Sequence, residues 1–300
     1  MIRFFDRQKL VRKGLACSKT RRRQSRHSLL DNLEGNPVAK VLLLVAFLAG
    51  LGALIFSTQQ SEPVKSVLIS ALILATAVVQ LWLGHGSVFS CNSRLLLVFG
   101  VLLIHLALLR VPLELAEAGV LGKRYAELLL PLGFAPLVLS VLLGRNYGLF
   151  AAVFGSLWGA LLFSDMDPVF VVMSLICGFI AVFVTLSVRR RSRLVRAGVY
   201  IGVATWVLAL TFGMIGPLSW PLTATDWQAV GLQSLLAVAV GIFTAMLVSG
   251  FLPMLESLFG ITTDISWLEM ADLNHPLLKR MTIEAPGTYP HSLVVANLAE

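Results

Sequence analysis

The chain has 300 residues, of which 57% are hydrophobic and 13% are charged, and its formal net charge is +8. A soluble protein of this length needs more polar side chains to cover its surface and spreads its charges along the chain. Here the charges cluster at the N-terminus, in short loops and in the last stretch, with long uncharged runs between them. This pattern excludes an ordinary soluble globular protein and indicates an integral membrane protein.

Residues 1–38 form a basic segment directly before a hydrophobic run. We interpret it as a topology signal that keeps the N-terminus in the cytoplasm, with a secondary attraction to anionic lipid headgroups. We expect no DNA or RNA partner. The three cysteines are scattered, which favours neither a disulfide framework nor a zinc site. Most of the positive charge lies at Arg3, Arg7, Lys9, Arg12, Lys13, Lys19, Arg21, Arg22, Arg23 and Arg26.

Residues 39–252 carry long apolar runs that predict a polytopic, all-α transmembrane helix bundle with about eight spans. Each run is close to the length that a helix needs to cross the hydrocarbon core. The loops on the N-terminal side carry arginines, and those on the other side are acidic or mixed, so both ends of the chain are expected in the cytoplasm. The runs cover residues 40–57, 66–84, 95–111, 128–144, 148–163, 169–188, 198–219 and 229–252.

Few polar side chains lie within these runs. His105 is the main one, with Gln80 and Gln233 as minor ones. A transport path needs polar groups at membrane depth, but we expect these three to form hydrogen bonds between helices instead. Two prolines, Pro131 and Pro136, predict a bend in the fourth run. Several glycines, Gly202 and Gly241 among them, permit close approach of helices.

The composition changes after Gly250, and residues 253–300 read as a cytoplasmic linker and the start of a soluble domain. Leu252 to Phe259 prolongs the last span, Gly260 is a natural helix stop, and short helices are expected over 266–270 and 275–284. Thr288 is placed as an N-cap before a further helix, with Pro290 in its first turn. On that helix, His291 shares a face with Val294 or Val295 and Leu298. From spacing alone, a lone histidine is more often a capping or packing residue than a ligand.

Four ordered stretches in this C-terminal region closely resemble the bacterial seven-transmembrane HD phosphohydrolases. They are Phe259–Ile265, Asp272–Leu278, Glu284–Leu293 and Ala296–Glu300. Weaker likeness in the spans extends the resemblance over roughly residues 95–300. It implies that the last stretch begins an all-α HD domain. It also implies hydrolysis of a cyclic dinucleotide, most simply cyclic di-AMP, by two metal ions, commonly iron or manganese.

By position, His291 matches the first metal-binding histidine of this family. Two metals polarise the phosphodiester and generate hydroxide near neutral pH, which one histidine cannot support. The sequence stops before the family's His-Asp pair, so we expect no complete catalytic set and no further cofactor-binding residue in these 300 residues. Whether this chain alone is an enzyme stays open. Family members also usually carry a large extracytoplasmic domain after the first span, where only Thr58 to Lys65 stands here.

The leading hypothesis is therefore a membrane-anchored, metal-dependent HD phosphohydrolase, of which this chain is the membrane and N-terminal part. The alternative is a non-catalytic membrane sensor or anchor module from a truncated product, and a transporter is the third hypothesis. We expect the chain in the bacterial inner membrane, with the lipid bilayer as its partner and a cyclic dinucleotide as substrate of the complete protein. The sequence leaves open whether the protein forms a homo-oligomer. It also leaves open the identity of the metal, the nucleotide base of the substrate and the signal that the membrane domain senses.

Overall fold

The computed structural model describes residues 36–58, 62–84, 89, 91–163, 168–185, 191–216, 224–263, 265, 266, 268 and 276–299, and these residues are helical with short connections. The all-α prediction is thereby confirmed. The basic residues of segment 1–35 and the segments 164–167, 186–190 and 217–223 lie outside the described residues. The helices are α2 (Pro37–Ser57), α3 (Pro63–Gly84), α5 (Asn92–Glu117), α6 (Lys123–Leu128), α7 (Phe134–Leu143), α8 (Arg145–Ala160), α9 (Pro168–Thr185), α10 (Arg191–Thr211), α11 (Ala224–Phe259), α13 (Pro276–Glu284) and α14 (Thr288–Ala299).

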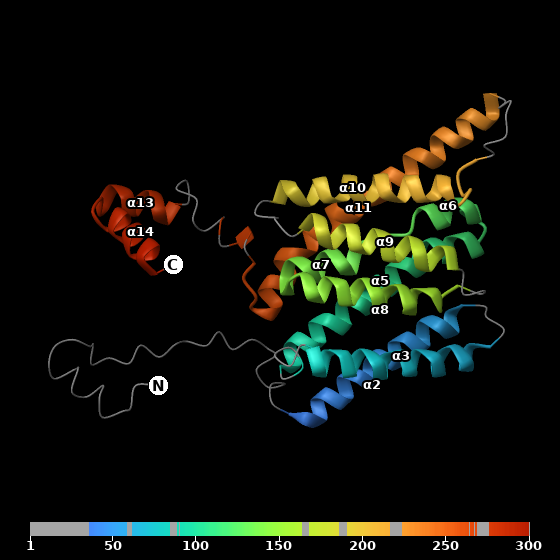
Figure 1. Ribbon diagram of the computed structural model, residues 1–300, viewed down its shortest axis with the longest axis horizontal. Helices are drawn as coiled ribbons and strands as arrows, with labels where there is room; N and C mark the ends of the chain where they lie inside the picture. Colours follow the sequence, from blue (N-terminus) through green and yellow to red (C-terminus); the bar gives the residue numbers. More distant parts are fainter. Residues whose placement is uncertain are drawn as a thin grey trace.

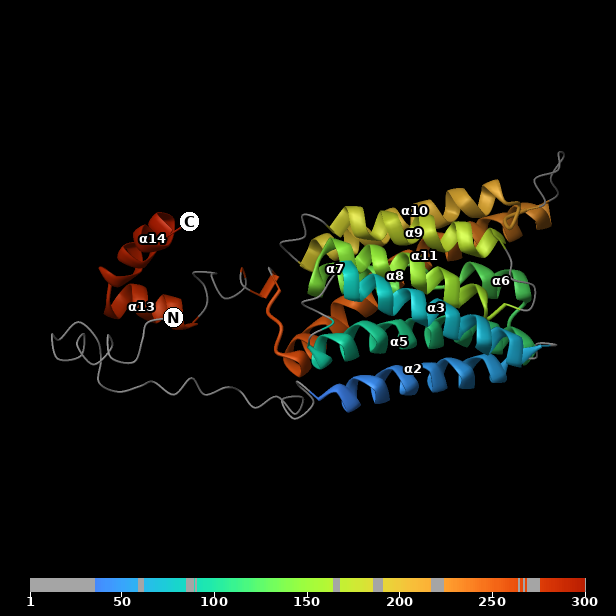
Figure 2. The same ribbon diagram turned by 60° about the horizontal axis from the view of Figure 1, so that its bottom comes forward.

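The helices from α2 to α11 lie side by side in one bundle, and α13 and α14 lie beyond the end of the bundle at which α11 ends (Figures 1 and 2). Within the bundle, α10 packs along α11, and α8 packs between α7 and α9. Aromatic side chains fill the region where α2 and α5 meet α8. The ring of Trp158 lies 5.0 Å from that of Phe47, which lies 4.8 Å from that of Phe99.

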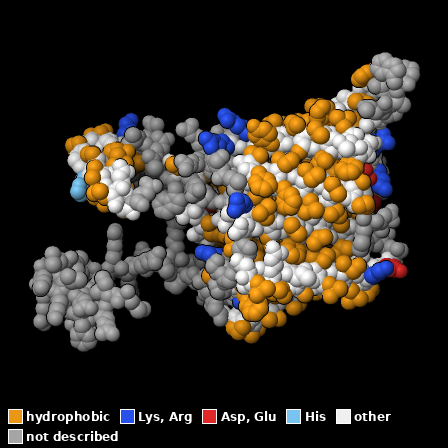
Figure 3. All heavy atoms as spheres, viewed as in Figure 1, with side chains coloured by type: hydrophobic (Ala, Val, Ile, Leu, Met, Phe, Trp, Pro, Cys, Tyr) orange, Lys and Arg blue, Asp and Glu red, His pale blue; other side chains and the backbone are white. Residues whose placement is uncertain are grey.

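The outer surface of the bundle is apolar, as a lipid environment requires. Figure 3 shows a broad hydrophobic band over the bundle, with charged side chains gathered at its two ends. Exposed apolar side chains such as Leu42, Leu83 and Met246 contribute to this surface. Within the described residues, six helices are long and apolar enough to cross a membrane, namely α2, α3, α5, α9, α10 and α11. The chain is a multi-pass membrane protein.

The prediction of about eight spans is slightly high when single helices are counted. The fourth run, residues 128–144, covers only the last residue of α6 and the whole of α7. The two helices are separate because Pro131 has no backbone N–H to continue a helix and the chain there makes turn bonds, from Leu132 N to Leu130 O (2.9 Å) and from Phe134 N to Pro131 O (3.2 Å). Pro136 is tolerated in the first turn of α7, where backbone N–H groups have no helical partner. At 16 residues, α8 is about 24 Å long, short of a core of roughly 30 Å.

The beginning of α2 and the end of α11 lie at the same end of the bundle. The side-chain amide of Asn92, at the start of α5, donates to the carbonyl of Asn36 (2.9 Å) just before α2. A polar cavity of about 400 Å³ lies between the start of α5, at Cys91 to Arg94, and the end of α11, at 259–262. The chain therefore leaves the bundle on the side from which α2 enters it, which requires an even number of passes.

The last span continues past residue 252, as expected. Helix α11 has 36 residues and ends at Phe259. Gly260 then takes a left-handed conformation (φ +63°), which a residue with a β-carbon rarely adopts. The Ile261 N–H donates to the Glu256 carbonyl (3.1 Å), a bond that reaches back over the last helical turn. The predicted helix stop at Gly260 is confirmed.

Candidate functional site

The candidate site lies on two short helices, α13 and α14, which contact each other across a tight turn. The turn is closed by Ala285 N donating to Met281 O (2.9 Å) and Thr288 N donating to Ala285 O (3.0 Å). On α13, Arg280 Nε and Glu284 Oε1 form an exposed ion pair at 2.7 Å, the i,i+4 spacing that supports short helices. The expected helix over 275–284 is confirmed within one residue.

His291 lies in the first turn of α14. Thr288 is the first helical residue rather than the N-cap residue before it, and Pro290 lies in the first turn as expected. The backbone N–H of His291 donates to the Gly287 carbonyl (3.4 Å), which leaves the imidazole outside the helical hydrogen bonds. The side chain is exposed. This exposure makes the residue accessible to a ligand or a metal ion.

The apolar residues behind His291 are exposed in this structure. Val294, Val295 and Leu298 follow the helical period as predicted, yet α14 buries none of its residues, and Leu298 is 83% exposed. An apolar stripe on a water-facing helix is usually covered by a partner surface.

A metal ion needs several ligands, and the described residues offer only part of a set. His291 fits as one ligand, because its imidazole is accessible. Among the residues that the structure describes, no three His, Cys, Asp or Glu side chains lie close enough together to hold a metal ion. His275 and Asp272, which belong to the resembling stretches, lie outside the described residues. The geometry therefore supports a single candidate ligand, and no catalytic step follows from it.

The polar side chains predicted within the membrane behave differently from one another. Gln233 is buried and accepts a hydrogen bond from the Gly216 N–H (3.0 Å), which ties α11 to the segment that follows α10 and not, as expected, to another helix. Gln80 is exposed on α3. His105 is 1% exposed and stacks on Phe134 with ring centroids 6.4 Å apart. Its Nδ1 atom makes no hydrogen bond with any described residue, so the expectation of a satisfied histidine is wrong at this atom.

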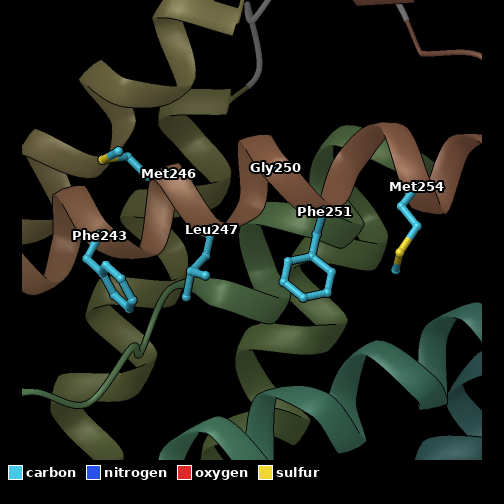
Figure 4. A pocket seen from close by; sticks show the side chains of 6 residues that line it. All are labelled: Phe243, Met246, Leu247, Gly250, Phe251 and Met254. Carbon is cyan, nitrogen blue, oxygen red and sulfur yellow. The ribbon is translucent and has the colours of Figure 1, made fainter.

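The open groove in Figure 4 is apolar and lies along one face of α11. Six residues of α11 line it, and Gly250 leaves its middle open, since a β-carbon there would meet no atom within 4 Å. At the inner edge, Phe251 packs edge-on against Phe134, with centroids 6.3 Å apart. The groove carries no group suited to catalysis. Its lining residues are Phe243, Met246, Leu247, Gly250, Phe251 and Met254.

Two charged sites were missed by the sequence analysis. Arg110 is buried in α5 and donates to both carboxylate oxygens of Glu117 at 2.7 Å, and to the Ser57 carbonyl at 2.9 Å. Glu256 binds two hydroxyls beyond the end of α11. The i+4 and i+7 spacing of Glu114 and Glu117 from Arg110 was the signal for the first site. No sequence signal pointed to the site at Glu256. Its donors lie beyond the helix stop at Gly260, where the helical period no longer predicts which residues meet.

A family model described as 7TM receptor with intracellular HD hydrolase matches residues 62–263. This region runs from the start of α3 past the end of α11. It contains seven helical segments if α6 and α7 count as one, and α2 stands before it. Of the seven, five are long and apolar enough to cross a membrane, namely α3, α5, α9, α10 and α11. His291 lies after the matched region.

Two curated relatives are similar over much of the chain. A cyclic-di-AMP phosphodiesterase PgpH of Listeria monocytogenes is 30% identical over 210 residues, which are 69% of this chain and 28% of the relative. A protein of the same name from Bacillus subtilis is 27% identical over 177 residues, 57% of this chain and 24% of the relative. The chain thus spans about a quarter of the length of these relatives.

An uncharacterized protein of Synechocystis is 32% identical over 114 residues, 38% of this chain and 14% of that protein. No solved structure matches the chain. The family model covers about two thirds of the 300 residues, from the first helix after residue 62 to the turn after α11. The chain therefore belongs to the family of 7TM receptors with an intracellular HD hydrolase.

Proposed function

We propose that this chain is the membrane portion and the opening segment of a metal-dependent HD phosphohydrolase that hydrolyses a cyclic dinucleotide, with cyclic di-AMP as the expected substrate. The family match over residues 62–263 carries the proposal. Two similar proteins bear the name cyclic-di-AMP phosphodiesterase. The resemblance of Glu284–Leu293 to the HD phosphohydrolases adds support from the residues that follow the matched region.

In this proposal His291 is one ligand of a divalent metal site. Manganese and iron are the candidates, and both accept imidazole nitrogen. The family's HD hydrolase domain implies divalent metals, which polarise a phosphodiester and lower the pKa of bound water when present. The contribution of the described residues is to hold the imidazole at the start of α14, with its ring exposed. A working site needs further ligands besides His291.

We place the protein in the bacterial inner membrane with both ends in the cytoplasm. The first turns of the helices that start at the same end as α2 carry positive charge and no Asp or Glu among their described residues. The opposite end carries both signs, as in the Lys65–Glu62 pair and the Arg110–Glu117 pair. Positive charge marks the cytoplasmic side. The residues are Lys40 in α2, Arg94 in α5, Arg145 in α8 and Arg193 in α10, and Arg196 follows in the second turn of α10.

The test uses the full-length protein with His291→Ala, purified in detergent. We expect the variant to lose bound manganese or iron, measured by elemental analysis, and to hydrolyse cyclic di-AMP at a rate lower by on the order of 100-fold or more. Ser292→Ala is the matched control. Ser292 is exposed on the same turn, and its hydroxyl donates to the Thr288 carbonyl (2.8 Å).

If His291→Ala keeps both its metal and its rate, the assignment of His291 is wrong. If the unmodified full-length protein binds no metal and leaves cyclic di-AMP intact, the enzyme proposal fails and the non-catalytic membrane module takes its place.

A further inference from the structure

The chain makes a sharp turn where it leaves α11. The left-handed Gly260 interrupts the helix, and a glycine without further contacts would act as a swivel between the membrane helix and the segment that follows. A movement of α11 would then not be transmitted past Gly260 to the segment that follows. The contacts across the turn decide whether the two parts move together.

Glu256 bridges this turn with both of its carboxylate oxygens. Its Oε2 accepts a hydrogen bond from the Ser266 hydroxyl (2.6 Å), and its Oε1 accepts one from the Thr263 hydroxyl. The Thr263 oxygen also accepts from the Ser266 backbone N–H (3.4 Å). Hydrogen bonds to an ionised carboxylate are stronger than those between neutral groups. The last turn of α11 is thus joined to residues three and six positions beyond Gly260.

Burial of an apolar side chain also holds the segment after Gly260 against the bundle. Ile265 is 2% exposed and belongs to the hydrophobic core of the bundle, and Thr263 is also buried. The chain therefore folds back onto the end of the bundle after Gly260 rather than running straight on. Ile261 and Thr262 line the polar cavity against Cys91 and Arg94, at the start of α5.

We propose that Glu256 is a clamp that makes the end of α11, Thr263 and Ser266 one rigid body, so that a displacement of α11 is passed to the cytoplasmic segment. Its action is positional. The carboxylate fixes the direction in which the chain leaves the membrane, and its removal restores the swivel at Gly260. This role does not depend on which reaction the protein performs.

The test measures the distance between nitroxide spin labels at position 235 on α11 and position 268 beyond the clamp, by pulsed electron paramagnetic resonance. Leu235 and Leu268 are both exposed, so labels there disturb no core contact. The experiment uses the whole 300-residue chain in lipid nanodiscs, with its three native cysteines replaced. In the parent we expect one narrow distance distribution. Glu256→Ala should broaden it about twofold or more, since the segment gains freedom when its anchor is lost.

A second variant changes the two hydroxyl donors, Thr263 and Ser266, and leaves Glu256 in place. Thr263→Val with Ser266→Ala removes both hydroxyls and keeps the carboxylate, and we expect similar broadening. Combining it with Glu256→Ala should add no further broadening, because all three changes break one set of bonds. Glu62→Gln is the control, as Glu62 forms an exposed pair with Lys65 (3.2 Å) at the other end of the bundle.

An unchanged distribution in Glu256→Ala overturns the proposal. So does an additive effect of the donor and acceptor variants, because Glu256 would then act through other partners. The readout is a distance and not a rate, so a failure here is distinct from a failure of the proposed phosphohydrolase activity.

Discussion

Arg110 is a buried cation in an apolar bundle, and its partners explain how it is tolerated. The guanidinium meets both oxygens of Glu117, the Ser57 carbonyl and, at 3.4 Å, Glu114. Since Ser57 is the last residue of α2, this site fastens α2 to α5. A buried charge that loses its partner is costly, whereas an exposed partner contributes little.

Glu117→Gln should therefore destabilise the protein by about 1–2 kcal/mol, less than a fully buried pair would lose, because the Glu117 side chain is 42% exposed. Glu114→Gln is the matched control, with a longer contact to the same guanidinium and a more exposed side chain. Thermal unfolding in detergent measures the difference. Equal effects of the two variants would show that the short bonds to Glu117 do not stabilise Arg110.

His291 and His105 show which features of a single residue the sequence predicts and which it does not. The pattern was enough to place His291 in the first turn of a helix, because capping and helical period are local. It was not enough for His105, whose surroundings come from Phe134 on α7 and Gly155 on α8. Whether a buried nitrogen finds a partner depends on residues far away along the chain.

At the scale of helices, the closest packing lies between α10 and α11. A β-carbon at Gly202 would lie 2.4 Å from the Val238 carbonyl oxygen, and one at Gly241 would lie 2.3 Å from the Gly202 nitrogen. Both obstacles are backbone atoms and cannot move aside. Small residues at such crossings allow backbones in a membrane to approach closely.

We expect Gly202→Ala to destabilise the bundle by about 1–3 kcal/mol, because the two helices must separate. Gly231→Ala should be neutral or stabilising by up to about 1 kcal/mol, since nothing lies within 4 Å of its β-carbon position and alanine favours a helix. The midpoint of denaturant unfolding in detergent checks both. A Gly202→Ala protein as stable as the parent would contradict the observed crossing.

The apolar runs predicted the helices well, but not their continuity. Long runs became α2, α3, α5, α9, α10 and α11, because an uncharged stretch of this length has one stable form in lipid. The fourth run contained the signal for its bend in Pro131, yet it did not predict α6, which lies almost wholly before the run and is separated from α7 by the turn at Pro131. Their separate lengths of 6 and 10 residues could not be read from hydrophobicity.

For the whole molecule, α2 starts and α11 ends at the same end of the bundle, so the chain passes through the membrane an even number of times. In a chain with all native cysteines replaced, cysteines at positions 62 and 123 should react with a membrane-impermeant maleimide in intact spheroplasts. Cysteines at 94 and 262 should react only after permeabilisation. Labelling of position 94 in intact spheroplasts would reverse the proposed orientation, and opposite behaviour of 94 and 262 would contradict an even number of passes.

The length of α11 has a mechanical consequence for the protein in its bilayer. Its 36 residues correspond to about 54 Å, against a hydrocarbon core of roughly 30 Å. Figure 1 shows that the first turns of this helix extend past the rest of the bundle. Where the apolar part of a helix is longer than the core, the helix adapts by tilting, at a cost of fractions of a kcal/mol per Å. A thinner or thicker bilayer should therefore change the angle of α11, and with it the position of Glu256 in the last turn of this helix.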